Sequence, residues 1–307
     1  MEFFRVKTNI DFIGKRNYAF VFSSILILIT IISLIFHKGP RYGVDFAGGI
    51  SVRVKFSQPV TAAAIKSGIQ TLNLSNCTVQ EFIEKGQHEF QIQSSTENLD
   101  IENIQASLTQ ALSKKFGEGR FEVRKIETVG PKVGKDLREK GLWAVVISWV
   151  MMLIYVAFRF KHFSFGLGGI VALAHDVLVT VGAFSITNRE IDLTIVAALL
   201  TIIGFSINDT IVIYDRVREN RRKTPGVSLP ELINRSINET LSRTIITTGT
   251  VLLGVVALFL FGGGVIHNFA FAMLVGCISG TYSTLYIASP VVIVWEEKFK
   301  GKKKRRY

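Results

Sequence analysis

The stretch LTIVAALLTIIGFSINDTIVIYDR (residues 193–216) is apolar for most of its length and then places a carboxylate, Asp209, where hydrocarbon is expected. An α-helix rises 1.5 Å per residue, so about 20 apolar residues cross a hydrocarbon core about 30 Å thick. The stretch therefore predicts a membrane-spanning helix at 193–214. Asp209 is a residue that such a helix accommodates only at a cost.

Similar apolar windows recur along the chain. Of its 307 residues 48% are hydrophobic, and the mean hydropathy is +0.35, which is unusual for a soluble protein of this length. We expect five further spans, at 17–36, 142–158, 165–187, 245–261 and 269–295. The first is too long for a cleaved secretory signal and is typical of a retained anchor. The predicted fold is a six-helix transmembrane bundle.

Basic residues gather in the segments that the spans leave on one side. These segments are 1–16, the turn at 159–161, a loop at 215–244 that leads into the fifth span, and the tail at 296–307. Within the loop we expect a turn at 223–226 and a helix-like stretch at 230–241. The positive-inside rule then places both termini in the cytoplasm. Segment 1–16 is predicted to lie amphipathically on the inner membrane surface, and a flexible leader is the alternative. A basic run beside a membrane meets lipid head groups, and no nucleic-acid-binding motif accompanies it, so we expect lipid contacts and no nucleic acid.

An extracytoplasmic domain is expected at 37–141, between the first two spans. Apolar residues alternate with polar ones at 50–56, which predicts a strand. Further strands are predicted at 78–83, 89–94 and 120–128, with helices at 61–72 and 99–116. The order β-α-β-β-α-β is that of a ferredoxin-like domain.

Few ionisable residues fall inside the spans. Asp209 and Arg243 lie near the same end of adjacent spans, and each would cost about 2.5–3.5 kcal/mol against lipid, so we expect them to pair inside the bundle. Arginine keeps its proton, so the carboxylate is the group that titrates, and Asp209 is predicted to carry protons. A permanent ion pair that fixes helix register is the alternative.

Five polar residues are predicted to support Asp209. Three lie on its own turn and offer hydrogen bonds to either protonation state: Ser206, Asn208 and Thr210. His175 and Asp176 could extend a proton path or simply bond their neighbours, and the sequence leaves both alternatives open. The spacing of Gly276 and Gly280 is typical of closely packed helices.

Motifs of enzymes are absent. The sequence has no P-loop, no His/Cys metal-ligand spacing and no serine or cysteine nucleophile motif. Its two cysteines, Cys77 and Cys277, fall in a polar region and an apolar window, so we expect no disulfide. We therefore expect no enzyme, no metal and no cofactor, and a function driven by an ion gradient or by the ATPase of a partner.

Motifs spread over nearly the whole chain resemble those of the SecF family of bacterial protein-export subunits, which are relatives of RND transporters. They are GVDFAGG (43–49), VGPKVGKDL (129–137), AHD (174–176), GFSINDTIVIYDRVREN (204–220) and SINETLSRT (236–244). The resemblance implies a bacterial cytoplasmic (inner) membrane location and half of a twelve-span RND-type body, with SecD supplying the other half.

The resemblance also implies a function. The pair would work beside the SecYEG channel and the ATPase SecA, and would use the proton-motive force to draw unfolded preprotein outward. Asp209 and Arg243 match the family residues implicated in proton transport. The coupling ion, H⁺ or Na⁺, stays open. Two alternatives also stay open: a scaffold subunit that transports nothing, and half of an RND-type exporter of lipid or small molecules.

Overall fold

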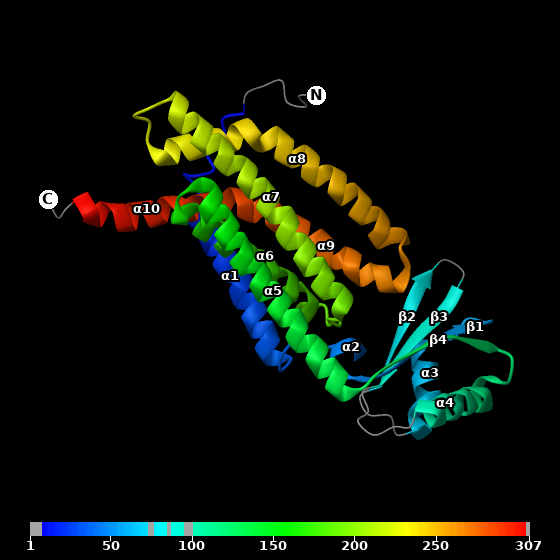
Figure 1. Ribbon diagram of the computed structural model, residues 1–307. Coiled ribbons are helices and arrows are strands. Elements are labelled where there is room, and N and C mark those ends of the chain that lie inside the picture. Colours follow the sequence, from blue (N-terminus) through cyan, green and yellow to red (C-terminus); the bar gives the residue numbers. More distant parts are fainter. Residues whose placement is uncertain (1–7, 73–76, 85–86, 95–100, 305–307) are drawn as a thin grey trace.

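The structure is a computed structural model that describes residues 8–72, 77–84, 87–94 and 101–304. Figure 1 shows a bundle of long helices with a small sheet domain beyond one end. The chain enters this domain from α1 (Arg16–Phe36) and leaves it through α5 (Pro131–Phe160).

Six helices in the described part of the chain are long and apolar enough to cross a membrane, which confirms the predicted number. After α1 and α5 come α6 (Phe163–Ile186), α7 (Leu193–Lys223) and α8 (Leu229–Phe261). The last is compound and consists of α9 (Gly263–Ser283), a π-helical turn (Thr284–Ala288) and α10 (Ser289–Lys304). The protein is therefore a multi-pass membrane protein.

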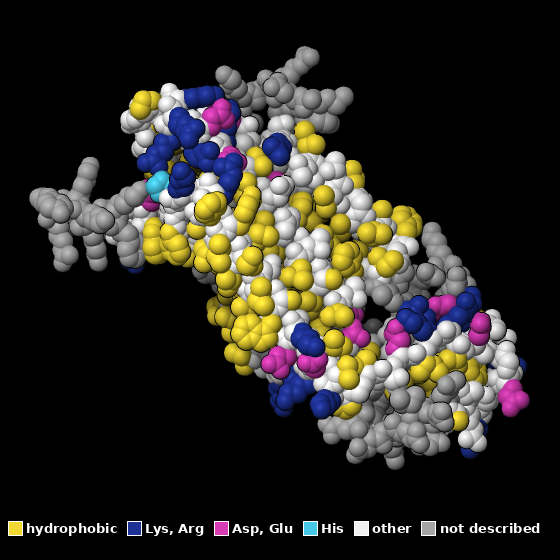
Figure 2. All heavy atoms as spheres, viewed as in Figure 1, with side chains coloured by type: hydrophobic (Ala, Val, Ile, Leu, Met, Phe, Trp, Pro, Cys, Tyr) yellow, Lys and Arg dark blue, Asp and Glu magenta, His cyan; other side chains and the backbone are white. Residues whose placement is uncertain are grey.

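The six helices divide into a central and a peripheral set. At least half of the most apolar window is buried in α6, α7 and the compound helix, against 17% in α1, α5 and α8. Figure 2 shows the outcome on one face: hydrophobic side chains form a broad band across the bundle, and many Lys and Arg side chains gather at the end away from the sheet domain. The band has the form expected of a surface that faces lipid.

The segment 215–244, predicted as a connecting loop with a turn at 223–226 and a helix-like stretch at 230–241, is mostly helical. Helix α7 continues to Lys223, and α8 begins at Leu229, where the Ser228 hydroxyl accepts a hydrogen bond from the Glu231 amide. The extension is stabilised by polar contacts between the two helices. Glu239 accepts from Arg216 (2.5 Å) and from Asn220 (2.7 Å). The apolar windows at 193–214 and 245–261 therefore give the predicted spans, and both helices continue beyond these windows on the side where the chain connects them.

The N-terminal segment packs on the bundle over the residues that the structure describes. Residues 1–7 lie outside them. The amides of Ile10 and Phe12 donate to the side-chain carbonyl oxygens of Asn238 and Asn234, each at 2.8 Å. Phe12 is buried and lies 5.5 Å from the ring of Tyr286. From residue 8 onward, the predicted surface-lying segment is thus attached to α8 and to the compound helix.

The sheet domain has the predicted ferredoxin-like order. Its strands are β1 (Gly49–Phe56), β2 (Thr78–Glu84), β3 (Gln87–Ser94) and β4 (Phe121–Val129), in the antiparallel order β2-β3-β1-β4. Helices α3 (Ala62–Ile69) and α4 (Ile101–Phe116) lie on one face of the sheet (Figure 1). Inward-facing strand residues such as Val54 and Phe90 pack with Ile65 and Leu112 of these helices and form a core separate from that of the bundle.

A closely packed connection joins this domain to the bundle. The short helix α2 (Val44–Ala47) is followed by Gly48, whose φ of +74° favours glycine, and a Cβ there would lie 2.7 Å from the Cα of Pro131 at the start of α5. The amide of Gly43 donates to the carbonyl of Ile191 at 3.0 Å, just before α7. The junction therefore packs closely against the start of α5 and is hydrogen-bonded to the segment just before α7.

Candidate functional site

Asp176 is the centre of the polar cluster inside the bundle. It lies on α6, fully buried, and both carboxylate oxygens accept hydrogen bonds. The Ser206 hydroxyl of α7 and the Ser283 hydroxyl of α9 donate to Oδ2, and the Ser279 hydroxyl of α9 donates to Oδ1, each at 2.7 Å. A carboxylate with three hydroxyl donors is well satisfied within an apolar bundle, because each bond to a charged group is stronger than one between neutral groups.

His175 extends this cluster. Its Nδ1 lies 3.3 Å from Asp176 Oδ1 and 3.4 Å from the Ser279 hydroxyl. The other ring nitrogen, Nε2, is buried without a hydrogen-bond partner in the described structure. The ring therefore has one nitrogen in the cluster and one available to a group that enters the bundle.

Asp209 lies in a different environment from Asp176. It is buried, with 2% of its surface exposed, yet its Oδ2 has no hydrogen-bond partner among the residues described. Arg243 of α8 acts on it electrostatically, but no ion pair within 4.0 Å joins the two in this part of the chain. Arg243 is instead exposed on the side of the bundle. The predicted pair is thus close enough to interact and is not in direct contact.

The residues predicted to support Asp209 have other partners. Ser206 donates to Asp176, as described above. Thr210 donates to the carbonyl of Ser206 at 3.2 Å and lies 3.0 Å from the hydroxyl of Thr284 in the π-helical turn. Asn208 is exposed on the surface of α7. Ser206 therefore bonds to α6 and Thr210 contacts the compound helix, and within the described chain none of the three forms a hydrogen bond with Asp209.

Ser279, Ser283 and Thr284 were missed in the sequence. The signal that could have found them is the run GCISGTYST, which sets two serines four residues apart beside two glycines. The predicted close packing at these glycines is confirmed: a Cβ on Gly276 would lie 2.2 Å from Ile202 Cδ1, and one on Gly280 would lie 3.1 Å from Ser206 Cβ. Because these glycines have no side chains, α9 packs closely against α7. In this position Ser279 and Ser283 of α9 also reach Asp176 on the neighbouring α6.

Metal-binding geometry is not seen in the described residues, where no three His, Cys, Asp or Glu side chains are grouped to hold an ion. Cys77 and Cys277 are free thiols. What the site offers chemically is two buried carboxylates, an imidazole and a chain of hydroxyls. These groups can accept, hold and pass a proton, or supply oxygen ligands to a small cation.

Two protein-family models match the chain. Residues 108–298 match the model of the protein export membrane protein SecD/SecF, C-terminal, and residues 33–60 match the SecD/SecF GG motif. The second match includes the glycine junction described above. The first covers more than half of the chain.

Curated relatives agree along nearly their whole length. The chain is 40% identical to the protein translocase subunit SecF of Calditerrivibrio nitroreducens over 294 residues, which are 95% of this chain and 96% of that protein. It is also 40% identical to the SecF subunit of Rickettsia typhi over 306 residues, 99% of this chain and 97% of that one.

Solved structures give the same result. The crystal structure of SecDF from Thermus thermophilus, described as a translocon-associated membrane protein, superposes with a TM-score of 0.85 at 34% identity. The match covers 96% of this chain and 40% of the SecDF chain. A super-membrane-facing form of SecDF gives a TM-score of 0.71 at 33% identity and covers 99% of this chain and 41% of that one. The predicted fold, half of an RND-type body with a ferredoxin-like domain, is confirmed, and the chain belongs to the SecF family of protein translocase subunits.

Proposed function

We propose that this chain, paired with a SecD-type chain in the bacterial cytoplasmic membrane, uses an ion gradient to promote the export of unfolded preprotein. The names of its relatives support a translocase role. The SecDF chain, of which this chain spans 40%, supports SecD as the partner, since the remainder leaves room for a second half of the body. The SecYEG channel and the ATPase SecA complete the proposed assembly.

The orientation proposed for the chain follows from its charge. Lys and Arg gather at the bundle end away from the ferredoxin-like domain (Figure 2), so that end and both termini are assigned to the cytoplasm. The domain then lies outside, where a preprotein emerges.

The observation that carries the proposal is the unsatisfied Oδ2 of Asp209. A buried carboxylate oxygen without a donor is costly while it is charged, and adding a proton lowers that cost because the neutral acid is less strongly hydrated. Protons that reach Asp209 would therefore change its interaction with Arg243 and shift the balance between two arrangements of α7 and α8. Na⁺ bound by the same oxygens would act in a similar way.

A second set of contacts supports transmission to the outer domain. Helix α7 extends about 24 Å from Asp209 back to Leu193 at its first turn. There the amide of Leu193 donates to Asp45 of α2 at 3.1 Å, in the junction that holds the domain. A displacement of α7 would thus move the attachment of the domain. His175 and Asp176 are proposed to relay protons through Ser206, which lies one turn from Asp209.

The test is Asp209→Asn in cells or inverted vesicles with the SecD-type partner. We expect the variant to insert and to co-purify with its partner, and to lose the gradient-dependent part of preprotein export. Asp215→Asn is the matched control, because its side chain is 39% exposed at the membrane boundary and pairs with Arg159. Full gradient-dependent export by Asp209→Asn would contradict the proposal. A lower yield of complex with normal export per complex would favour the scaffold alternative.

A further inference from the structure

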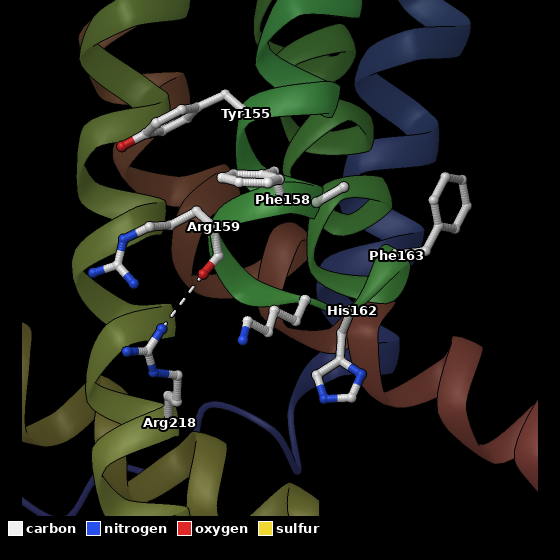
Figure 3. Close-up of a pocket in the computed structure, with 8 residues that line it drawn as sticks. Tyr155, Phe158, Arg159, His162, Phe163 and Arg218 are labelled. Atoms are coloured by element: carbon white, nitrogen blue, oxygen red, sulfur yellow. Dashed lines mark hydrogen bonds between the residues drawn. The ribbon is translucent and has the colours of Figure 1, made fainter.

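A groove of about 750 Å³ opens where α5 turns into α6, beside α7 (Figure 3). It lies at the bundle end where basic residues gather, away from the ferredoxin-like domain. Its lining combines cationic and aromatic side chains, which neither the polar cluster nor the proposed export function uses.

The cationic wall comes from two helices. Arg218 of α7 donates from Nη1 to the backbone carbonyl oxygen of Arg159 at 3.4 Å, and both guanidinium groups lie on the α7 side of the groove (Figure 3). Arg159 is paired with Asp215 at 3.0 Å. Lys161 and Arg218 form no ion pair within the described ranges, so the groove keeps excess positive charge.

The aromatic wall faces away from the protein interior. Phe158 is 86% exposed, Phe163 54% and Tyr155 51%. One turn further along α5, Met151 and Ile154 are also more than half exposed. The surface is therefore cationic at the end of the spans and apolar along the adjoining part of α5, toward the middle of the bundle. A lipid leaflet presents its phosphate and its acyl chains in the same order.

We propose that this groove binds an anionic phospholipid, with its phosphate between Lys161 and Arg218 and its acyl chains along Phe158 and the exposed face of α5. Basic pockets between membrane helices recognise anionic head groups in this way. A zwitterionic lipid offers the same phosphate but carries a cation that the groove would repel. A soluble acidic peptide would leave the aromatic wall unused.

The test is native mass spectrometry of the full-length chain in detergent, titrated with dioleoylphosphatidylglycerol or dioleoylphosphatidylcholine. We expect the anionic lipid to bind more tightly than the zwitterionic one. Each basic residue near a membrane surface changes affinity roughly fivefold, so Lys161→Gln with Arg218→Gln should weaken phosphatidylglycerol binding by roughly 25-fold. Lys161→Arg with Arg218→Lys keeps the charges and should bind like the unmodified chain, which separates lost charge from misfolding.

Arg221→Gln with Arg222→Gln is the matched control, since it removes the same charge from exposed positions of α7 that do not line the groove. This control should bind phosphatidylglycerol with little change. An equal loss in the control and in the groove variant would overturn the proposal in favour of diffuse attraction. Displacement of the lipid by millimolar inorganic phosphate would show a site for free phosphate. Unchanged lipid binding in the groove variant, with loss of the SecD-type chain on purification, would assign the groove to a protein partner.

Discussion

Asp176 and Asp209 are both carboxylates buried in the bundle, and their surroundings are opposite. Asp176 accepts hydrogen bonds from three serine hydroxyls, each at 2.7 Å, whereas Oδ2 of Asp209 has no hydrogen-bond partner in the described chain. A satisfied buried group stabilises one arrangement of helices, and an unsatisfied one is costly unless something else uses it. Asp176 therefore stabilises the packing of α6, α7 and α9, beside its proposed relay role, whereas Asp209 is the residue to which we assign the proposed ion coupling.

The positions of the two residues explain the difference. Asp176 lies where the three most buried helices, α6, α7 and the compound helix, meet. Asp209 lies on the side of α7 toward α8, a peripheral helix, and interacts electrostatically with Arg243 of that helix. Arg243 and Asn208 are exposed there, so this side of the bundle offers polar groups to the proposed second half of the body.

The largest expected effect on stability comes from replacing the satisfied carboxylate. Asp176→Ala leaves three buried hydroxyls without their acceptor and should cost about 2–3 kcal/mol, since hydrogen bonds inside membranes are individually modest. Asp209→Ala removes a carboxylate whose Oδ2 has no hydrogen bond to lose, and should cost less than about 1 kcal/mol. Thermal unfolding of both variants in one detergent measures the difference. Equal losses would remove the distinction between the two residues.

A smaller effect tests whether the hydroxyls around Asp176 act individually. Ser279→Ala removes one donor to Asp176 and should cost about 1 kcal/mol. Ser24→Ala, on an exposed position of α1, is its control and should unfold like the unmodified chain. If Ser279→Ala has no effect, the cluster does not stabilise the packing of α9.

The smallest effect concerns a carboxylate near water. Burial raises the pKa of Glu239, but hydrogen bonds from Asn220, Arg235 and Arg216 outweigh it and lower the pKa to about 2. Because the folded pKa lies below the ordinary value of 4.5, the stabilisation by Glu239 is complete above about pH 4.5 and is lost as the pH falls toward about 2. Glu239→Gln should therefore lower Tm slightly near pH 6, by about 2 °C or less, and not near pH 2. A Tm difference that does not change with pH would contradict this assignment.

Local patterns predicted the fold well, and contacts distant in sequence were the part they could not supply. Apolar windows gave the six spans, and alternation gave the strand order, because both depend on neighbouring residues. Ser279 and Ser283 lie more than 100 residues from Asp176, so only the packing of α9 against α6 and α7 brings them together.

Such patterns did not predict that α7 continues to Lys223. An apolar window stops where charged residues begin, and α7 and α8 continue there because Arg216, Asn220 and Glu239 bond to one another. The predicted contact between Asp209 and Arg243 rested on shared depth in the membrane. Shared depth does not fix which way an arginine side chain points.

The central claim, that Asp209 carries the coupling ion, is tested most directly by ion flux through the reconstituted complex with its SecD-type partner. Conductance is measured for the unmodified chain and for Asp209→Asn, in a proton gradient and in a sodium gradient of equal size. We predict that the unmodified complex conducts one of the two ions and that Asp209→Asn abolishes this conductance while the complex stays assembled. Equal conductance by the variant and the unmodified complex would contradict the claim.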